Sequence, residues 1–311
     1  MFSTPKNCSS SERDASQVSR RRFLAELAVT GVGLSALTTS CRVAPPASKM
    51  RLACQSNAWP FTSGLNGLVP VLETIKSLDF QGYETSFRNV QEAFSNPKPA
   101  RTRLEATGLA CAGVHVAAPD QYEAETSIPP LDFLRTIADG SSALGVEYFV
   151  LSGRGVGEVN GQLDRDALKR KVAAVLEIAQ YCHDVGITLA YHNHVDDFLN
   201  GGAEVDELLD TGNGLIKAWL CVHNAEFADV KVADYFSKRH EHIAGIHLTN
   251  ILQTKPDHHP FDGQSLLTEI EKAAWKGWLI IEEERTRERR EWPETSAVTK
   301  SRQHVRKIFG I

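Results

Sequence analysis

Four apolar segments of the chain carry histidine, cysteine or glutamate at or near their carboxyl ends, and this pattern constrains the fold more than any other feature. The segments are Ile187–His194, Ile216–Asn224, Ile243–Asn250 and Trp278–Glu284. Residues two positions apart in a strand share a face, so His192 and His194 are expected to point in the same direction. Several strands with polar groups at their carboxyl ends are typical of a parallel barrel with an active site at one mouth.

Strand and helix patterns alternate from Met50 onwards and predict a single α/β domain, residues 49–311, with the (β/α)8 TIM-barrel fold. The strands are expected at 50–58, 82–87, 109–117, 146–152, 187–194, 216–224, 243–250 and 278–284, and the helices at 68–78, 90–107, 130–144, 163–185, 204–210, 230–239, 265–274 and 295–309. Eight β-α units in about 260 residues match the usual size of this barrel. An open doubly wound sheet is the alternative, but residues 57–64 (NAWPFTSG) lack the Gly-rich turn that such a sheet places after its first strand.

Residues 1–48 differ from the rest and are expected to form an export signal and a linker. The segment 19–24 (SRRRFL) has paired arginines before Phe-Leu, and the apolar run Ala25–Leu37 follows with Glu26 as its only charge. This order is typical of a twin-arginine signal peptide, and the run is short for a membrane span. A basic amphipathic helix is the alternative. Cys41 is a candidate lipid anchor, so the domain is expected in the periplasm or attached outside the cytoplasmic membrane.

The domain that follows this segment is acidic, which argues against nucleic acid as a partner. The whole chain has a net charge of -5, and without residues 1–48 there remain 28 Lys and Arg against 36 Asp and Glu, or -8. The remaining cysteines are Cys54, Cys111, Cys182 and Cys221, and none forms a C-x-x-C pair. A zinc knuckle and a redox motif are therefore excluded. A homo-oligomer is left open.

A closed barrel would bring the polar strand ends to a common mouth. The residues concerned are Trp59, Glu84, His115, His192, His194, Cys221, His223, His247 and Glu282. A divalent metal ion is the simplest reason to gather imidazole and carboxylate groups in one place. We expect the imidazole of His247 and the carboxylate of Glu282 to lie within about 8 Å of each other at the same mouth.

The domain from Met50 to Ile311 resembles the xylose isomerase-like barrel superfamily of sugar isomerases, epimerases and inosose dehydratases. The segments that carry the resemblance are 80–87 (FQGYETSF), 190–198 (AYHNHVDDF), 244–250 (AGIHLTN) and 277–285 (GWLIIEEER). Each segment is a loose signature, but their order and spacing together are specific.

The resemblance implies a metal site at His192, Cys221, His247 and Glu282. The last two match the family pattern, whereas many members have Glu in place of His192, and Asp is usual in place of Cys221. A shift of strand register would put Glu283 or Glu284 in the position of Glu282. Two imidazoles, a thiolate and a carboxylate favour Zn over Mn or Mg, and a protonated Cys221 would leave three ligands. The expected cofactor is therefore a divalent ion, Zn or Mn.

The resemblance also implies a reaction, which is metal-assisted proton transfer beside a carbonyl through an enediolate. Glu282 and His192 are the expected catalytic residues. A sugar is expected to contact Trp59, Glu84, His115, His194 and Arg285.

The predicted function is thus an exported isomerase or epimerase of a sugar, a polyol or a keto-sugar. A keto-sugar dehydratase would use the same enediolate. A carbohydrate-binding pseudoenzyme, with a metal site degenerate at Cys221, is the main alternative. An apurinic-site endonuclease would need a basic face, which the net charge of the domain does not favour.

Overall fold

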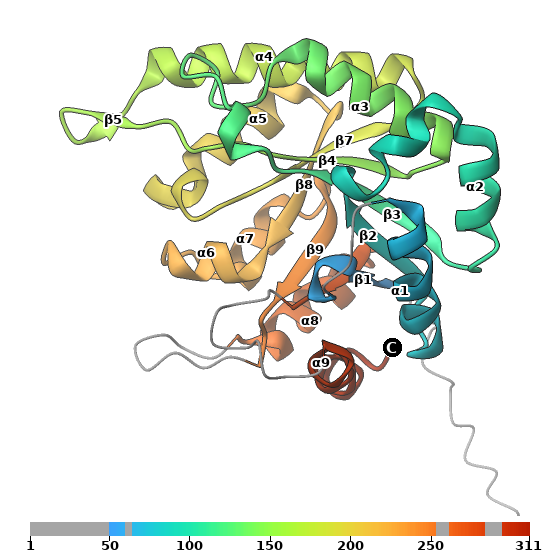
Figure 1. Cartoon of the computed structure of the whole chain (residues 1–311). Coiled ribbons are helices and arrows are strands. Elements are labelled where there is room, and N and C mark those ends of the chain that lie inside the picture. Colours follow the sequence, from blue (N-terminus) through green and yellow to red (C-terminus); the bar gives the residue numbers. More distant parts are fainter. Residues whose placement is uncertain (1–49, 60–63, 253–260, 284–293) are drawn as a thin grey trace, which may run out of the picture. The chain divides into compact units, whose positions relative to one another are not determined.

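The protein is described here from a computed structural model that covers residues 50–59, 64–252, 261–283 and 294–311. Within these residues, eight parallel strands close into a barrel in the order β1-β10-β9-β8-β7-β4-β3-β2. Helices surround the barrel (Figure 1). The prediction of a TIM barrel is therefore confirmed, whereas the predicted export signal, Cys41 and Arg285 lie outside the described residues.

The barrel strands are short and end where the polar residues begin. They are β1 (Arg51–Gln55), β2 (Gly82–Ser86), β3 (Ala110–Val116), β4 (Tyr148–Ser152), β7 (Thr188–His192), β8 (Ile216–Cys221), β9 (Ile243–Thr249) and β10 (Trp278–Glu282). The α-helices are α1 (Leu65–Ser77), α2 (Pro97–Glu105), α3 (Leu131–Leu144), α4 (Arg165–Asp184), α5 (Ala203–Gly212), α6 (Val222–Phe227), α7 (Val232–Arg239), α8 (Gly263–Lys272) and α9 (Glu294–Phe309).

The predicted helix 90–107 is broken in the structure. A 3-10 helix, Gln91–Ser95, precedes α2, and Asn96 between them has φ -146° and ψ 69°. The ring of a proline excludes the residue before it from the α region, so Pro97 forces this interruption and then begins α2 at a position where its missing N–H is harmless.

The predicted strand 187–194 stops at His192, so the prediction that His194 shares a strand face with it is wrong. The N–H of His194 donates to Asp197 Oδ2 (2.7 Å) instead of to a neighbouring strand. The two imidazole rings still lie close together, with centroids 5.4 Å apart.

A small hairpin that the sequence analysis did not predict precedes α4. Strands β5 (Glu158–Val159) and β6 (Gln162–Leu163) pair around Asn160 and Gly161, both with positive φ. Asn-Gly is the preferred pair for a two-residue turn of this kind.

Two tryptophans fill the barrel interior because other strands carry glycine where the indole rings lie. Trp219 and Trp278 are at most 1% exposed. A Cβ atom on Gly245 would lie 2.5 Å from the Trp219 ring, and one on Gly82 would lie 2.6 Å from the Trp278 ring. The lower half of the barrel is thus close-packed and apolar, and the polar strand ends lie above it.

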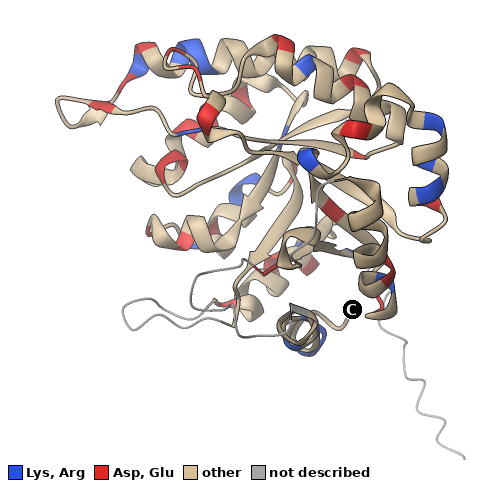
Figure 2. Ribbon diagram, in the orientation of Figure 1, with Lys and Arg blue, Asp and Glu red and all other residues tan. Residues whose placement is uncertain are grey.

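Acidic and basic residues are interspersed on the outer helices in Figure 2. Among the residues that the structure describes, no helix is both long enough and apolar enough to cross a membrane.

The substitution Gly245→Ala is expected to reduce the free energy of unfolding by about 1–3 kcal/mol, because the new methyl group overlaps Trp219. The matched control is Gly157→Ala, where a Cβ would meet nothing within 4 Å and the change should stay below about 0.5 kcal/mol. Urea unfolding followed by circular dichroism measures both. Equal midpoints for the two variants would contradict this account of the interior.

Candidate metal centre

Strand register brings the polar strand ends together at one mouth of the barrel. Ser152 is paired with His192, Cys221 with His247, and Thr249 with Glu282. A cavity of about 290 Å³ opens at these positions. Of the residues predicted for the site, those that line the cavity are His115, His192, His194, Cys221, His223 and Glu282, and His223 does so from α6 instead of from a strand.

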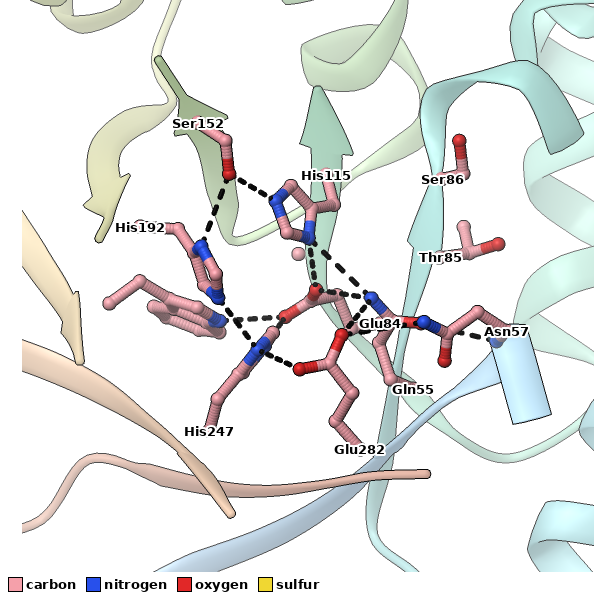
Figure 3. A network of polar contacts seen from close by, with 12 residues as sticks. Gln55, Asn57, Glu84, Thr85, Ser86, His115, Ser152, His192, His247 and Glu282 are labelled. Atoms are coloured by element: carbon pink, nitrogen blue, oxygen red, sulfur yellow. Dashed lines mark hydrogen bonds and ion pairs between the residues drawn. The ribbon is translucent and has the colours of Figure 1, made fainter. Parts of the chain in front are cut away.

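Three of the predicted ligands lie in direct contact. His192 Nε2 is 3.1 Å from His247 Nδ1, and the same Nδ1 is 3.0 Å from Glu282 Oε2 (Figure 3). The ligand atoms of all three residues lie within 4.8 Å of one another. The expectation that His247 and Glu282 meet at the same mouth is therefore confirmed.

Each of the two histidines has its other ring nitrogen fixed by a buried partner. His192 Nδ1 is 3.2 Å from Ser152 Oγ, and His247 Nε2 is 2.8 Å from Glu84 Oε2. Since a carboxylate can only accept, His247 Nε2 carries a hydrogen. Such outer partners orient a histidine so that its remaining nitrogen can bind a metal ion.

Glu84 and Glu282 are satisfied by several donors. The indole of Trp219 donates to Glu84 Oε2 (2.7 Å). The amide of Gln55 donates to Glu84 Oε1 (3.3 Å) and to Glu282 Oε1 (3.2 Å), and therefore bridges the two carboxylates. The hydroxyl of Thr249 donates to Glu282 Oε2 (2.7 Å).

These contacts determine the charges at the site. Burial alone would raise the pKa of Glu282, but the charge of His247 and hydrogen bonds from His247 and Thr249 lower it to about 2. The pKa of Glu84 is also far below its ordinary value, since His247 and His115 outweigh the effect of burial. Burial would lower the pKa of His247, but Glu84 and Glu282 raise it to about 10. On its own, the chain thus holds His247 as an imidazolium between two carboxylates.

His192 is held in the opposite state. Burial, followed by the charge of His247, lowers its pKa well below the ordinary value, so it is neutral at neutral pH. A neutral imidazole has the free lone pair that a metal ligand or a general base requires.

Cys221 lies beside this group but is not one of its three members. Its Sγ is 3.3 Å from Thr249 Oγ1, whereas the three residues with mutually close ligand atoms are His192, His247 and Glu282. The backbone of Cys221 is held by Asn193, whose Oδ1 accepts from its N–H at 2.8 Å. Its role as a ligand stays a prediction.

The remaining predicted residues are placed as follows. His115 Nδ1 is 3.0 Å from Glu84 Oε1, and its Nε2 is 2.7 Å from Ser152 Oγ. Glu84 is fully buried behind His247 and is not among the residues that line the cavity. Trp59 donates to Thr295 Oγ1 (3.3 Å) and is likewise outside the cavity lining.

Other residues of the site were missed by sequence reasoning. Gln55, Asn57, Arg88 and Thr249 line the cavity, and Ser152 contacts two histidines, His115 and His192. Gln55, Ser152 and Thr249 are each the last residue of a strand, so the rule that identified His192 could have identified them. They lack the residue types that suggest metal chemistry.

The donor set fits a divalent metal ion. Bonds of about 2.0–2.1 Å to a tetrahedral zinc ion put neighbouring ligand atoms about 3.3 Å apart, close to the distances from His247 Nδ1 to His192 Nε2 (3.1 Å) and to Glu282 Oε2 (3.0 Å). A metal ion bound at His247 Nδ1 would take the place of the hydrogen there, while Nε2 would still donate to Glu84. Two imidazoles and a carboxylate suit Zn, and Mn to a lesser degree.

Known proteins share this fold. A family described as "Xylose isomerase-like TIM barrel" matches residues 72–308. An L-ribulose 3-epimerase has a TM-score of 0.71 at 16% identity and covers 84% of this chain and 95% of its own. A sugar phosphate isomerase/epimerase from Parabacteroides distasonis has a TM-score of 0.64 at 14% identity, with 85% and 96% covered. The 3-keto-D-glucoside 4-epimerase YcjR from E. coli has a TM-score of 0.62 at 11% identity, with 83% and 99% covered. No curated protein sequence matches the chain.

The substitution Ser152→Ala is expected to weaken metal binding 10- to 100-fold, because His192 loses the partner that orients its ring. Isothermal titration with Zn²⁺ and Mn²⁺ measures the effect. The control Ser86→Ala removes a hydroxyl that lines the same cavity but does not contact His192, His247 or Glu282. Equal affinities for the two variants would show that Ser152 does not orient a ligand.

Proposed function

Because the chain belongs to the xylose isomerase-like TIM barrel family, we propose that it is a sugar isomerase or epimerase that depends on a divalent metal ion. The observation that carries this proposal is the group of His192, His247 and Glu282 at the mouth of the barrel. The solved structures with the same fold include sugar epimerases and isomerases. Their names point to a carbohydrate substrate for this cavity.

The residues at the cavity can hold and move protons. Glu282 is ionised at neutral pH, so a carboxylate oxygen can accept a proton from the carbon beside a carbonyl; His192 is neutral and can do so where its lone pair does not hold the metal ion. A bound divalent ion would polarise that carbonyl and stabilise the negative charge that develops on its oxygen. Epimerisation requires return of the proton to the opposite face, and the two residues come from different strands, β7 and β10.

Other residues position Glu282 and the substrate. The amides of Gln55 and Asn57 donate to Glu282 Oε1 at 3.2 and 3.3 Å, which leaves Oε2 directed at His247 and Thr249. The imidazoles of His115 and His194 line the cavity, where they can bind sugar hydroxyls. A dehydratase acting on a keto-sugar would begin with the same proton removal.

A carbohydrate-binding pseudoenzyme is the second candidate, because Cys221 replaces the aspartate that is usual at this position. The metal content of the purified protein separates the isomerase from the pseudoenzyme. An isomerase should retain close to one metal ion per chain, whereas fewer than about 0.1 per chain with intact sugar affinity would favour the pseudoenzyme.

We also propose export by the twin-arginine route, on the basis of the sequence motif at residues 19–24. The protein would then act in the periplasm or from the outer side of the cytoplasmic membrane, free or anchored at Cys41.

The substitutions His247→Ala and Glu282→Gln are expected to abolish metal retention and turnover while the domain stays folded. Each removes one of three mutually close ligands. Metal analysis, a keto-sugar isomerisation assay and thermal unfolding measure the three properties. Wild-type activity in either folded variant would eliminate this site assignment.

The substitution Cys221→Asp is expected to raise the affinity for Mn²⁺ relative to Zn²⁺ by about tenfold or more, because a hard oxygen donor replaces sulfur. Competition between the two metals in the purified variant measures the ratio. An unchanged ratio would show that Cys221 does not bind the metal ion.

A further inference from the structure

Beside the metal centre lies a second group of buried charges, formed by Lys171, Asp197 and Glu204, which we call the Lys171 cluster. The side chains of Lys171 and Asp197 are 0% exposed and that of Glu204 is 1% exposed. None of these residues lines the cavity. Taking an ammonium and two carboxyl groups out of water is costly unless each of them is hydrogen-bonded, so their partners matter.

The ammonium group of Lys171 uses all three of its hydrogens. They are donated to Arg154 O (2.7 Å), Asp197 Oδ1 (2.9 Å) and a carboxylate oxygen of Glu204. Arg154 lies in the connection after β4, Asp197 in the connection after β7, and Glu204 in the first turn of α5. One side chain from α4 therefore joins two adjacent connections at the mouth of the barrel.

The two carboxylates extend this arrangement to the backbone. Asp197 Oδ2 accepts from the N–H of His194 (2.7 Å), and Glu204 Oε2 accepts from the N–H of Val156 (2.9 Å). The hydroxyl of Tyr191 donates to Asp197 Oδ1 (2.9 Å). His194 is thus held by its backbone through Asp197.

The ring of His194 is held by the other connection. Its Nδ1 is 3.1 Å from Gly153 O, and a carbonyl oxygen can only accept, so the hydrogen lies on Nδ1. Gly153 directly precedes Arg154, whose carbonyl accepts from Lys171. Both attachments of His194 therefore depend on segments that Lys171 holds together.

From this geometry we infer that Lys171 is a positioning residue, which fixes the imidazole of His194 at the wall of the cavity for contact with substrate. The substrate contact rests on the proposed function, whereas the attachment of His194 does not. The positive charge of Lys171 supports this role. Burial would lower the pKa of Lys171, but Asp197 and Glu204 raise it above the ordinary value, so the side chain stays an ammonium.

A second metal ion is an alternative explanation for this region, because ligand atoms of His194, Asp196 and Asp197 lie within 4.8 Å of one another. The contacts argue against it. Asp196 Oδ2 accepts from the N–H of Gly155 (2.9 Å), Asp197 is bound by Lys171, and Nδ1 of His194 carries a hydrogen. These groups connect the two loops instead.

The experiment compares Lys171→Met with Lys169→Met in the full chain. Lys169 lies on the same helix with its side chain 80% exposed. Correlation spectra of ¹⁵N-labelled histidine report the state of His194, assigned with His194→Ala. The Nδ1–H signal should be present in the wild type and in Lys169→Met, and lost or averaged in Lys171→Met. An unchanged signal in Lys171→Met would overturn the inference. If Lys171→Met does not fold, Glu204→Gln takes its place in the same comparison.

Steady-state kinetics give an independent readout. If Lys171 only stabilised the fold, its effect on KM would not depend on the presence of His194. Lys171→Met should raise KM at least tenfold, with kcat and metal content changed less than threefold. In a His194→Ala background, the same substitution should change KM less than twofold. A tenfold change in both backgrounds would overturn the inference. If the wild type turns over no sugar, the proposed function fails, and the Nδ1–H signal alone decides the role of Lys171.

Discussion

The whole site depends on the contacts of His247, whose two ring nitrogens each lie against a carboxylate. Glu84 and Glu282 would be costly to bury as a pair, because like charges repel and both have lost water. The imidazolium between them offsets this cost, and the Gln55 amide adds a donor to each. A divalent cation at Nδ1 would serve the same electrostatic purpose with one more charge. The position between the two carboxylates therefore favours a positive charge, and the surrounding residues meet that requirement.

The barrel supplies this position through strand register and through the distribution of side-chain volume. Pairing of neighbouring strands puts the last inward-facing residue of each strand at one level. Below this level, Trp219 and Trp278 fill the space that Gly245 and Gly82 leave open. The indole of Trp219 also donates to Glu84, so one side chain belongs both to the apolar packing and to the polar network.

The fold and the central residues of the site could be predicted because both depend on short-range pattern. Apolar strands that carry His247 and Glu282 near their carboxyl ends indicate a barrel and its active mouth from sequence alone. The orientation of each imidazole could not be predicted, since Ser152 and Glu84 are far from His192 and His247 in the sequence and only strand pairing and barrel closure bring them together. Lys171 lies in a helix next to Arg170 and two residues from the exposed Lys169, and only the structure shows that Lys171 is buried. The Asn160-Gly161 pair predicts a tight turn, which the sequence analysis did not include. The helix breaks before Pro97 because the proline ring excludes the preceding residue from the helical region, even though the apolar spacing favours a helix.

The two tryptophans that fill the barrel determine how a ligand can enter and leave the cavity. Both are buried and fill the lower end of the barrel, so a ligand enters and leaves the cavity at its mouth. His194 lines this mouth and lies in one of the two connections that Lys171 joins, so a reactant and its product both pass an imidazole whose backbone Asp197 holds.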